Sequence, residues 1–200
     1  MAKVILEPIG RLREVILPGE TWTAQLARME RLNAELQRKR DEVRRGWGPK
    51  YERRVHEKGK LTTWERIARL QDADSPVLPI GTLVNYGRTF GSEQRTSPGA
   101  GVVTAFLRVH GRWTVVIAND NTVASGSWWP QTPEKIQRAQ EIALRLRLPV
   151  VYLVDCSGLF LPEQSNTFPG RVGAGAIFRM NAVTTPAPGE LRCSLPNVRP

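Results

Sequence analysis

Hydrophobic positions in the first third of the chain recur with the period of an α-helix. Within residues 22–45 the apolar side chains follow at steps of 4, 3, 3 and 4, and they are Trp22, Leu26, Met29, Leu32 and Leu36. Arg and Glu occupy the other faces, so the pattern predicts an amphipathic helix that ends at Gly46, Gly48 and Pro49. Because the polar face carries both signs of charge, a seam in a short helical bundle is favoured over a calmodulin-type or membrane-surface helix.

A second helix is predicted within "KLTTWERIARLQD" at residues 60–72. Thr62 or Thr63 can cap its start, and Trp64, Ile67 and Leu70 recur at threefold spacing. Asp72 to Pro79 then break the helical pattern. The sequence therefore predicts an N-terminal segment at 1–21 and a helical arm at 22–75.

The pattern changes to β-rich runs after Pro79, and these are "GTLVNYG" (81–87), "GVVTAFLRVHG" (101–111) and "RWTVVIAND" (112–120). The letters "HGR" at 110–112 predict a tight hairpin turn. A helix follows from Pro133 to Leu146, with its apolar face directed at the sheet. The uninterrupted apolar run "PVVYLVD" (149–155) is typical of a strand covered on both faces, so Val150–Val154 is expected to be a central strand. Strand, helix and strand predict a parallel right-handed crossover in an α/β core.

Composition and charge narrow the class of protein. With 200 residues, 40% of them hydrophobic and 24% charged, the chain is long enough for one domain with a core plus a helical arm. The net charge of +10 is divided equally between residues 1–75 and 76–200. Such a charge indicates an acidic partner, which could be nucleic acid, a membrane surface or a phosphate-bearing ligand.

The two cysteines, Cys156 and Cys193, are too few for a disulfide framework and lack the pairing of a zinc site. They favour a reduced, cytoplasmic setting and no metal. Glu7, Glu14 and Glu20 interrupt the N-terminus, which argues against a signal or transit peptide. No apolar run reaches the length of about 18 residues that a bilayer requires, so no membrane partner is expected.

Polar residues follow the last predicted strand at Asp155, Cys156, Ser157 and Gly158. In an α/β sheet the ligand crevice lies beyond the carboxyl ends of the parallel strands. A plain strand-to-loop turn with Gly158 in the left-handed conformation is an equally weighted alternative.

Nucleophilic catalysis is disfavoured, because neither of the two histidines, His56 and His110, lies where a base for Ser157 or Cys156 is expected. No metalloprotease, P-loop or dinucleotide motif is present. Catalysis by backbone N–H groups that stabilise an oxyanion remains, and it requires small residues such as Ser157 and Gly158. The glycine-rich stretch "GRVGAGAIF" (170–178) could supply further N–H groups to an oxyanion or phosphate.

Five motifs then carry a resemblance to a known family, and they are "GKLTTWERI" (59–67), "NDNTVASGS" (119–127), "KIQRAQEIA" (135–143), "DCSG" (155–158) and "FPGRVGAGAIFRMNA" (168–182). In this order they resemble the N-terminal part of the carboxyltransferase (β) subunits of biotin-dependent acyl-CoA carboxylases. The methylcrotonoyl-CoA and propionyl-CoA carboxylase type is most similar, and glutaconyl-CoA decarboxylase is related.

The resemblance implies an incomplete crotonase/ClpP-like ββα spiral layer at residues 76–182, preceded by the helical arm. It implies carboxyl transfer between carboxybiotin and an acyl-CoA, with the backbone N–H groups of Ser157, Gly158 and Leu159 as oxyanion donors. The acyl-CoA-binding residues that it implies are Ser125, Gly126, Lys135, Arg138, Arg66, Arg69, Gly173 and Gly175. The four basic side chains among them are expected to face the CoA phosphates.

The resemblance also implies partners. Biotin is expected on a separate carrier protein, acyl-CoA is the substrate, and no metal takes part. The expected partners are a biotin carboxylase or carrier subunit and further carboxyltransferase subunits, which form homo-oligomers in the family.

Departures from the family concern the end of the chain and three loop positions. Residues 183–200 form a Pro-rich, irregular tail where the family continues into a second glycine-rich loop and a second domain. Ser125–Ser127 stand where many members have Gly-Gly, "DCSG" replaces Asp-Ser-Gly-Gly, and Leu159 and Phe160 replace smaller residues. We therefore expect a truncated chain, natural or frameshifted, that does not transfer carboxyl groups alone.

Two alternatives stay open. One is a non-catalytic homologue that binds a full-length subunit through its first helix. The other is a basic nucleic-acid-binding protein, which is less favoured because basic and aromatic residues do not interleave on a β-surface. The identity of the acyl-CoA, and the choice between carboxylase and decarboxylase, also stay open.

Overall fold

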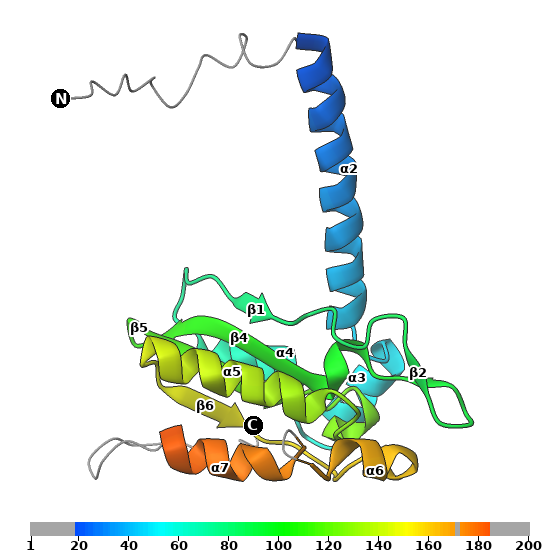
Figure 1. The fold of residues 1–200 in the computed structure, drawn as a ribbon, viewed down its shortest axis with the longest axis vertical. Helices are drawn as coiled ribbons and strands as arrows, with labels where there is room; N and C mark the ends of the chain where they lie inside the picture. Colours follow the sequence, from blue (N-terminus) through cyan, green and yellow to red (C-terminus); the bar gives the residue numbers. More distant parts are fainter. Residues whose placement is uncertain (1–18, 171–172, 185–200) are drawn as a thin grey trace, which may run out of the picture. The chain divides into compact units, whose positions relative to one another are not determined.

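The computed structural model describes residues 19–170 and 173–184 and divides the chain into two compact units, Met1–Lys39 and Arg40–Pro200 (Figure 1). In the first unit the described residues belong to helix α2 (Gly19–Arg44), which confirms the helix predicted within residues 22–45. Leu26, Met29 and Leu32 are exposed on it. The predicted bundle seam is therefore not formed among residues 19–39.

The first helix that lies wholly in the second unit is α3 (Pro49–Glu57), which the sequence analysis did not predict. Gly48 precedes it at φ 90°, and Pro49 suits its first turn because a proline lacks only an N–H that the first turn leaves unbonded. Helix α4 (Thr63–Leu70) follows. Thr62 caps it by accepting a hydrogen bond from the Glu65 N–H while the Glu65 carboxylate accepts from the Thr62 N–H, which confirms one of the two predicted caps.

Four strands form the main sheet in the order β1-β4-β5-β6, and their bounds are β1 (Leu78–Ile80), β4 (Val102–Val109), β5 (Arg112–Asn119) and β6 (Val150–Leu153). Strands β4 and β5 form the predicted hairpin, in which His110 (φ 49°) and Gly111 (φ 76°) make the turn. Helix α5 (Thr132–Leu146) connects β5 to β6, and these two strands are parallel, as predicted.

Helices cover both faces of this sheet (Figure 1). On one face α5 and α7 (Gly175–Thr184) pack with β4 and β5 through Val115, Ile117, Ile136, Ala139 and Ile177. On the other face Ile67 of α4 packs on Leu107, Val116, Ala118 and Leu153. The side chains of β6 alternate between the two clusters, which confirms that both of its faces are covered.

Two predictions about strands are wrong. Strand β6 is the last strand of the described sheet rather than a central one, because an apolar run reports coverage of the faces and not the presence of two hydrogen-bonded neighbours. Residues 81–87 form turns, with Gly81, Asn85 and Gly87 at positive φ, and not a strand. Apolar Leu83 and Val84 are too few to override these turn-forming residues.

Short elements complete the unit. They are the two-stranded sheet of β2 (Thr89–Phe90) and β3 (Arg95–Thr96), the 3-10 helices η1 (Pro98–Gly101), η2 (Ala124–Gly126) and η3 (Leu161–Glu163), and helix α6 (Gln164–Thr167). Helix α7 runs through the first two residues of the predicted tail. The rest of that tail, and the predicted N-terminal segment up to residue 18, lie outside the described residues. Over the described ranges no helix is both long and apolar enough to cross a membrane, and no cluster of potential metal ligands occurs.

Candidate active site

Two loops lie side by side at the carboxyl ends of β5 and β6. The Trp128 N–H donates to the Gly158 carbonyl (2.9 Å), and the Phe160 N–H donates to the Trp128 carbonyl (2.8 Å). The hydroxyl oxygens of Ser127 and Ser157 are 2.8 Å apart. The structure thus brings the loop of residues 124–128 and the loop of residues 155–160 together, as the pairing of Ser125 and Gly126 with Ser157 and Gly158 requires.

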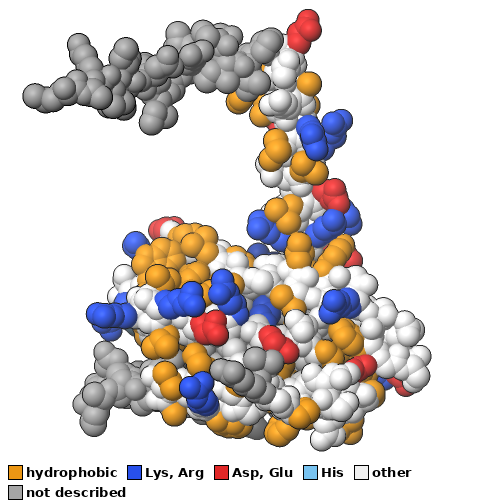
Figure 2. All heavy atoms as spheres, in the orientation of Figure 1, with side chains coloured by type: hydrophobic (Ala, Val, Ile, Leu, Met, Phe, Trp, Pro, Cys, Tyr) orange, Lys and Arg blue, Asp and Glu red, His pale blue; other side chains and the backbone are white. Residues whose placement is uncertain are grey.

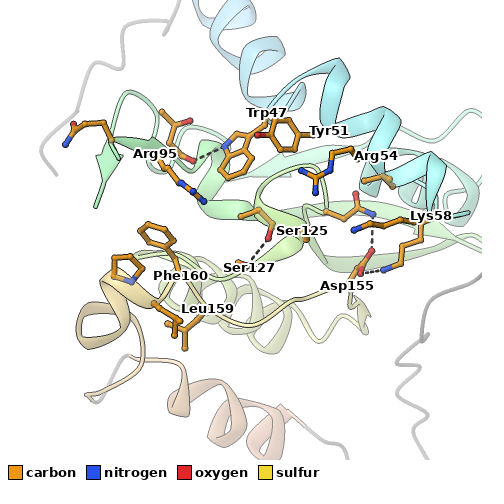
Figure 3. A pocket seen from close by; sticks show the side chains of 18 residues that line it. Trp47, Tyr51, Arg54, Lys58, Arg95, Ser125, Ser127, Asp155, Leu159 and Phe160 are labelled. Atoms are coloured by element: carbon orange, nitrogen blue, oxygen red, sulfur yellow. Dashed lines mark hydrogen bonds and ion pairs between the residues drawn. The ribbon is translucent and has the colours of Figure 1, made fainter. Parts of the chain in front are cut away.

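A cavity of about 820 Å³ opens beside these loops (Figure 3). Its walls come from α3 and the segment that follows it, from β3, and from both loops. Of the predicted site residues, Ser125 and Leu159 line the cavity. Ser157 and Gly158 are exposed next to Leu159 and do not line it.

The backbone N–H groups of the two loops differ in their hydrogen bonding. The Gly126 N–H donates to the Val123 carbonyl (2.9 Å), so it is not available to a ligand. The Gly158 N–H makes a weak contact with the Cys156 sulfur (3.4 Å). The N–H groups of Ser157 and Leu159 have no acceptor among the described residues. These two amides can therefore donate to an oxyanion, whereas the Gly126 amide stabilises the turn of its own loop.

Helix α3 places a cationic and aromatic surface opposite the loops (Figure 3). The residues involved are Trp47, Tyr51, Arg54 and Lys58, all of which line the cavity. Arg54 lies over the Tyr51 ring, with 5.7 Å from its Cζ to the ring centroid. Within the described chain neither Arg54 nor Lys58 forms an ion pair. Their charges are therefore free to meet an anionic ligand.

The sequence analysis missed this surface, although a signal for it was present. The four residues are spaced at steps of 4, 3 and 4, which places them along one side of a helical segment. Charged residues dominate this segment, and Val55 is its one buried residue in the described structure, so it has no apolar stripe that would predict a helix.

Apolar side chains line the other end of the cavity, together with Arg95, which is ion-paired with Glu93 (Figure 3). The Phe160 ring stacks on Trp129, with centroids 4.1 Å apart and an interplanar angle of 20°. Trp129 is fully buried and also contacts Phe90 and Trp47. Phe160 therefore packs on a buried tryptophan at this end of the cavity.

Lys60 and Asp155 form an ion pair at the cationic end. The Lys60 ammonium donates to one Asp155 carboxylate oxygen (2.8 Å), and the Asn121 amide donates to the other (3.1 Å). The Asp155 side chain is 11% exposed and that of Lys60 is 35% exposed. This pair is charge-balanced, in contrast to Arg54 and Lys58.

The prediction that Lys135 faces a CoA phosphate is wrong. Lys135 is buried, and its ammonium donates to the carbonyls of Gly99 (2.8 Å) and Val102 (2.7 Å). Burial lowers the pKa of Lys135 to about 7, while the nearby Asp120 carboxylate acts to raise it. The reason for the error is helical geometry, since Lys135 lies one turn before the buried Ala139 on the inward face of α5.

The other predicted basic residues do not line the cavity. Arg66 is buried on α4, where burial lowers the pKa of its guanidinium and attraction to Asp155 raises it. Arg69 and Arg138 are exposed on α4 and α5. On the face drawn in Figure 2, the visible Lys and Arg side chains of the second unit are scattered among hydrophobic and acidic ones rather than joined in one basic surface.

The predicted glycines of the "GRVGAGAIF" stretch are also away from the cavity lining. Gly173 packs against the carbonyls of Phe168 and Pro169, so that no side chain fits there. The Gln137 side-chain amide donates to the Gly173 carbonyl (3.3 Å), and Gly175 begins α7. In the described structure these residues anchor α7 against α5.

Comparison with known proteins identifies relatives. The family model described as "Carboxyl transferase domain" matches residues 54–185. The chain is 44% identical over 159 residues to the biotin-dependent 3-methylcrotonyl-coenzyme A carboxylase beta1 subunit of Mycobacterium tuberculosis, which covers 80% of this chain and 29% of the relative. It is 37% identical over 129 residues to the glutaconyl-CoA decarboxylase subunit alpha of Acidaminococcus fermentans, covering 64% of this chain and 21% of the relative.

A solved structure shares the fold. Transcarboxylase 12S, described as a hexamer with methylmalonyl-coenzyme A and methylmalonic acid bound, superposes with a TM-score of 0.68 at 25% identity. The match covers 78% of this chain and 30% of that one. These findings confirm the resemblance and the crotonase-like fold expected from the sequence. The chain spans less than a third of the length of these relatives.

Proposed function

Since this chain belongs to the carboxyl transferase domain family, we propose that it is a carboxyltransferase component whose cavity binds an acyl-CoA thioester. The single observation that carries the proposal is the unbonded Leu159 N–H, with the unbonded Ser157 N–H two residues before it, at a cavity with Arg54 and Lys58 at one end and Phe160 at the other. A thioester of CoA has the matching parts in the matching order: phosphates, a carbonyl and an acyl group.

The cationic end takes the CoA phosphates. Arg54 on α3 and Lys58, which directly follows α3, line the cavity and have no carboxylate partner among the described residues. Arginine and lysine in this state bind phosphate through charge-assisted hydrogen bonds. Tyr51 and Trp47 lie next to them and offer flat apolar surface to the rest of the CoA.

The thioester carbonyl lies at the N–H groups of Ser157 and Leu159. Removal of a proton or a carboxylate from the α-carbon places negative charge on this oxygen, and fixed N–H donors stabilise that charge without reorganising. Leu159 lines the cavity and Ser157 precedes it by two residues, so the conformation of this loop decides how the two amides meet the oxygen.

The acyl group points to the wall of Leu159, Phe160, Leu161 and Pro162. An apolar wall favours an apolar acyl group, since each buried CH₂ contributes about 0.8 kcal/mol. Carboxybiotin, brought by a separate carrier subunit, supplies or receives the carboxyl group. The partners of the proposed component are that carrier or biotin carboxylase subunit and further carboxyltransferase subunits.

Calorimetric titration with CoA and with 3-methylcrotonyl-CoA tests the proposal. We expect Arg54→Gln and Lys58→Met each to weaken the binding of both ligands several-fold at low salt and less at high salt, because salt screens exposed charges. Arg138→Gln, an exposed charge on α5 outside the cavity, is the matched control and should bind as the unmodified chain does. Absence of binding, or an equal loss in the control, would overturn the proposal.

A further inference from the structure

We propose that Lys60 and Asp155 are a positioning pair that holds the loop of residues 155–160 where its N–H groups reach the thioester oxygen. The inference rests on the proposed function and assigns a role to two residues that the family resemblance left without one. Neither side chain is assigned contact with the reacting atoms. Their effect reaches the substrate through the backbone that follows Asp155.

Asp155 joins three parts of the fold. Its carboxylate accepts from Lys60, in the connection between α3 and α4, and from Asn121, just after β5. The Asn121 amide also donates to the Leu61 carbonyl (2.9 Å), so the same connection is tied twice. The Asp155 main chain packs against Gly126. Asp155 is therefore fixed from the side chain and from the backbone.

The residues that follow Asp155 have few other restraints. Up to Gly158, the loop is tied to its neighbour by the Ser157 hydroxyl, which lies near the Ser127 hydroxyl and donates to the Ala124 carbonyl (3.1 Å). The first backbone hydrogen bond to the neighbouring loop is the one accepted by the Gly158 carbonyl. Release of the Asp155 side chain would leave Ser157 and its N–H held mainly by a hydroxyl.

Lys60 differs from the cations that we assign to phosphate. It lines the same cavity as Lys58, but its charge is neutralised by Asp155. The pair is partly buried, and breaking such a pair by removal of one partner is costly. The buried Arg66 also interacts with Asp155. Loss of the Asp155 carboxylate therefore leaves two cations, Lys60 and Arg66, without their anion, whereas loss of Lys60 leaves Asp155 with Arg66. Asp155→Asn is therefore the more severe change.

The test compares two ligands across four variants. The ligands are CoA, which has no acyl oxygen, and a CoA thioether carrying a nitronate, whose charged oxygens mimic the enolate. We expect Lys60→Met and Asp155→Asn to weaken the nitronate complex about tenfold or more and the CoA complex about twofold or less. The double variant should be no weaker than Asp155→Asn, because the two residues act as one unit. Lys58→Met should weaken both complexes alike.

A second measurement uses the ligand-free chain and does not depend on the proposed function. Amide chemical shifts of residues 157–159 should move in Lys60→Met and Asp155→Asn, and stay unchanged in Lys58→Met and Arg138→Gln. Unmoved shifts in the first two variants overturn the positioning pair, as does an equal loss of CoA and nitronate affinity in Lys60→Met. Failure of the unmodified chain to bind either ligand overturns the proposed function instead, while the shifts still decide whether the pair positions the loop.

Discussion

A methyl group on Gly126 would overlap the carbonyl oxygen of Asp155, so the loop after β5 and the loop after β6 meet main chain to main chain. Gly126 also has φ +77°, a conformation that residues with side chains adopt at a cost. The position therefore requires glycine for two reasons. The contact sets the distance between the two loops that flank the proposed thioester site.

Replacement of this glycine should separate the loops. We expect Gly126→Ala to lower the free energy of unfolding by about 2–4 kcal/mol, from the left-handed backbone and the steric overlap together. The control is Gly111→Ala in the hairpin turn, where φ is +76° and no atom lies near the added Cβ, so that only about 1 kcal/mol is lost. Urea unfolding of the two variants measures the difference. Equal losses would show that the contact with Asp155 does not constrain the loop.

The buried Lys135 predicts a pH dependence of stability. Its pKa is about 7 in the folded chain and 10.5 for an ordinary lysine. Between these values the unfolded state binds more protons, so the free energy of unfolding gains from this residue as pH rises, by at most about 1.4 kcal/mol per pH unit. Below pH 7 both states are protonated and the contribution is constant. Urea unfolding between pH 6.5 and 9.5 should show this rise in the unmodified chain and in Lys58→Met. Curves for Lys135→Met that stay parallel to them would contradict the assignment.

The capping box of α4 predicts a local stability effect. Thr62→Ala removes the acceptor for the Glu65 N–H and should lower the free energy of unfolding by about 1 kcal/mol. Thr62→Ser keeps a hydroxyl in the same place and should restore most of the loss. Denaturation by urea at constant pH measures both. A serine variant as unstable as the alanine variant would mean that the methyl group of Thr62, and not the cap, contributes the stability.

The wall at Phe160 predicts acyl selectivity. Phe160→Leu removes the ring that stacks on Trp129 and enlarges the apolar end of the cavity. Relative affinity for thioesters with a longer acyl group should rise, and a change of one methylene in such a pocket corresponds to about 1–3 kcal/mol. CoA should bind unchanged, and Phe168→Leu, an exposed position outside this cavity, should alter no ratio. Calorimetry with a series of acyl chain lengths decides; an unchanged preference in Phe160→Leu would place the acyl group elsewhere.

Much of the fold could be predicted because its signals are local. The hairpin at His110 and Gly111 lies between two β-rich runs, and α5 carries a regular apolar face. The position of β6 in the sheet could not be predicted from its own sequence, because the hydrogen-bonding neighbours of a strand are set by the topology of the whole sheet. Helix α3 could not be predicted in this way because it has one buried residue, Val55, rather than an apolar stripe.

The site was predictable in part for a similar reason. Small residues after two strands identified both loops, since close backbone approach requires them. Which N–H groups are free depends on turns such as the 3-10 turn that uses the Gly126 amide, and the residue types alone do not reveal these hydrogen bonds. Lys135 shows the limit most clearly, because only the packed structure reveals that its ammonium binds two buried carbonyls.

An NMR titration with isotope-labelled chain tests the central claim most directly, namely that the Ser157 and Leu159 amides receive the thioester oxygen. Spectra are compared on addition of CoA and of 3-methylcrotonyl-CoA. The account predicts that the amide proton signals of Ser157 and Leu159 move downfield with the thioester only, while signals of Arg54 and Lys58 move with both ligands. Unmoved signals at Ser157 and Leu159 in the thioester complex, or equal shifts with CoA alone, would contradict it.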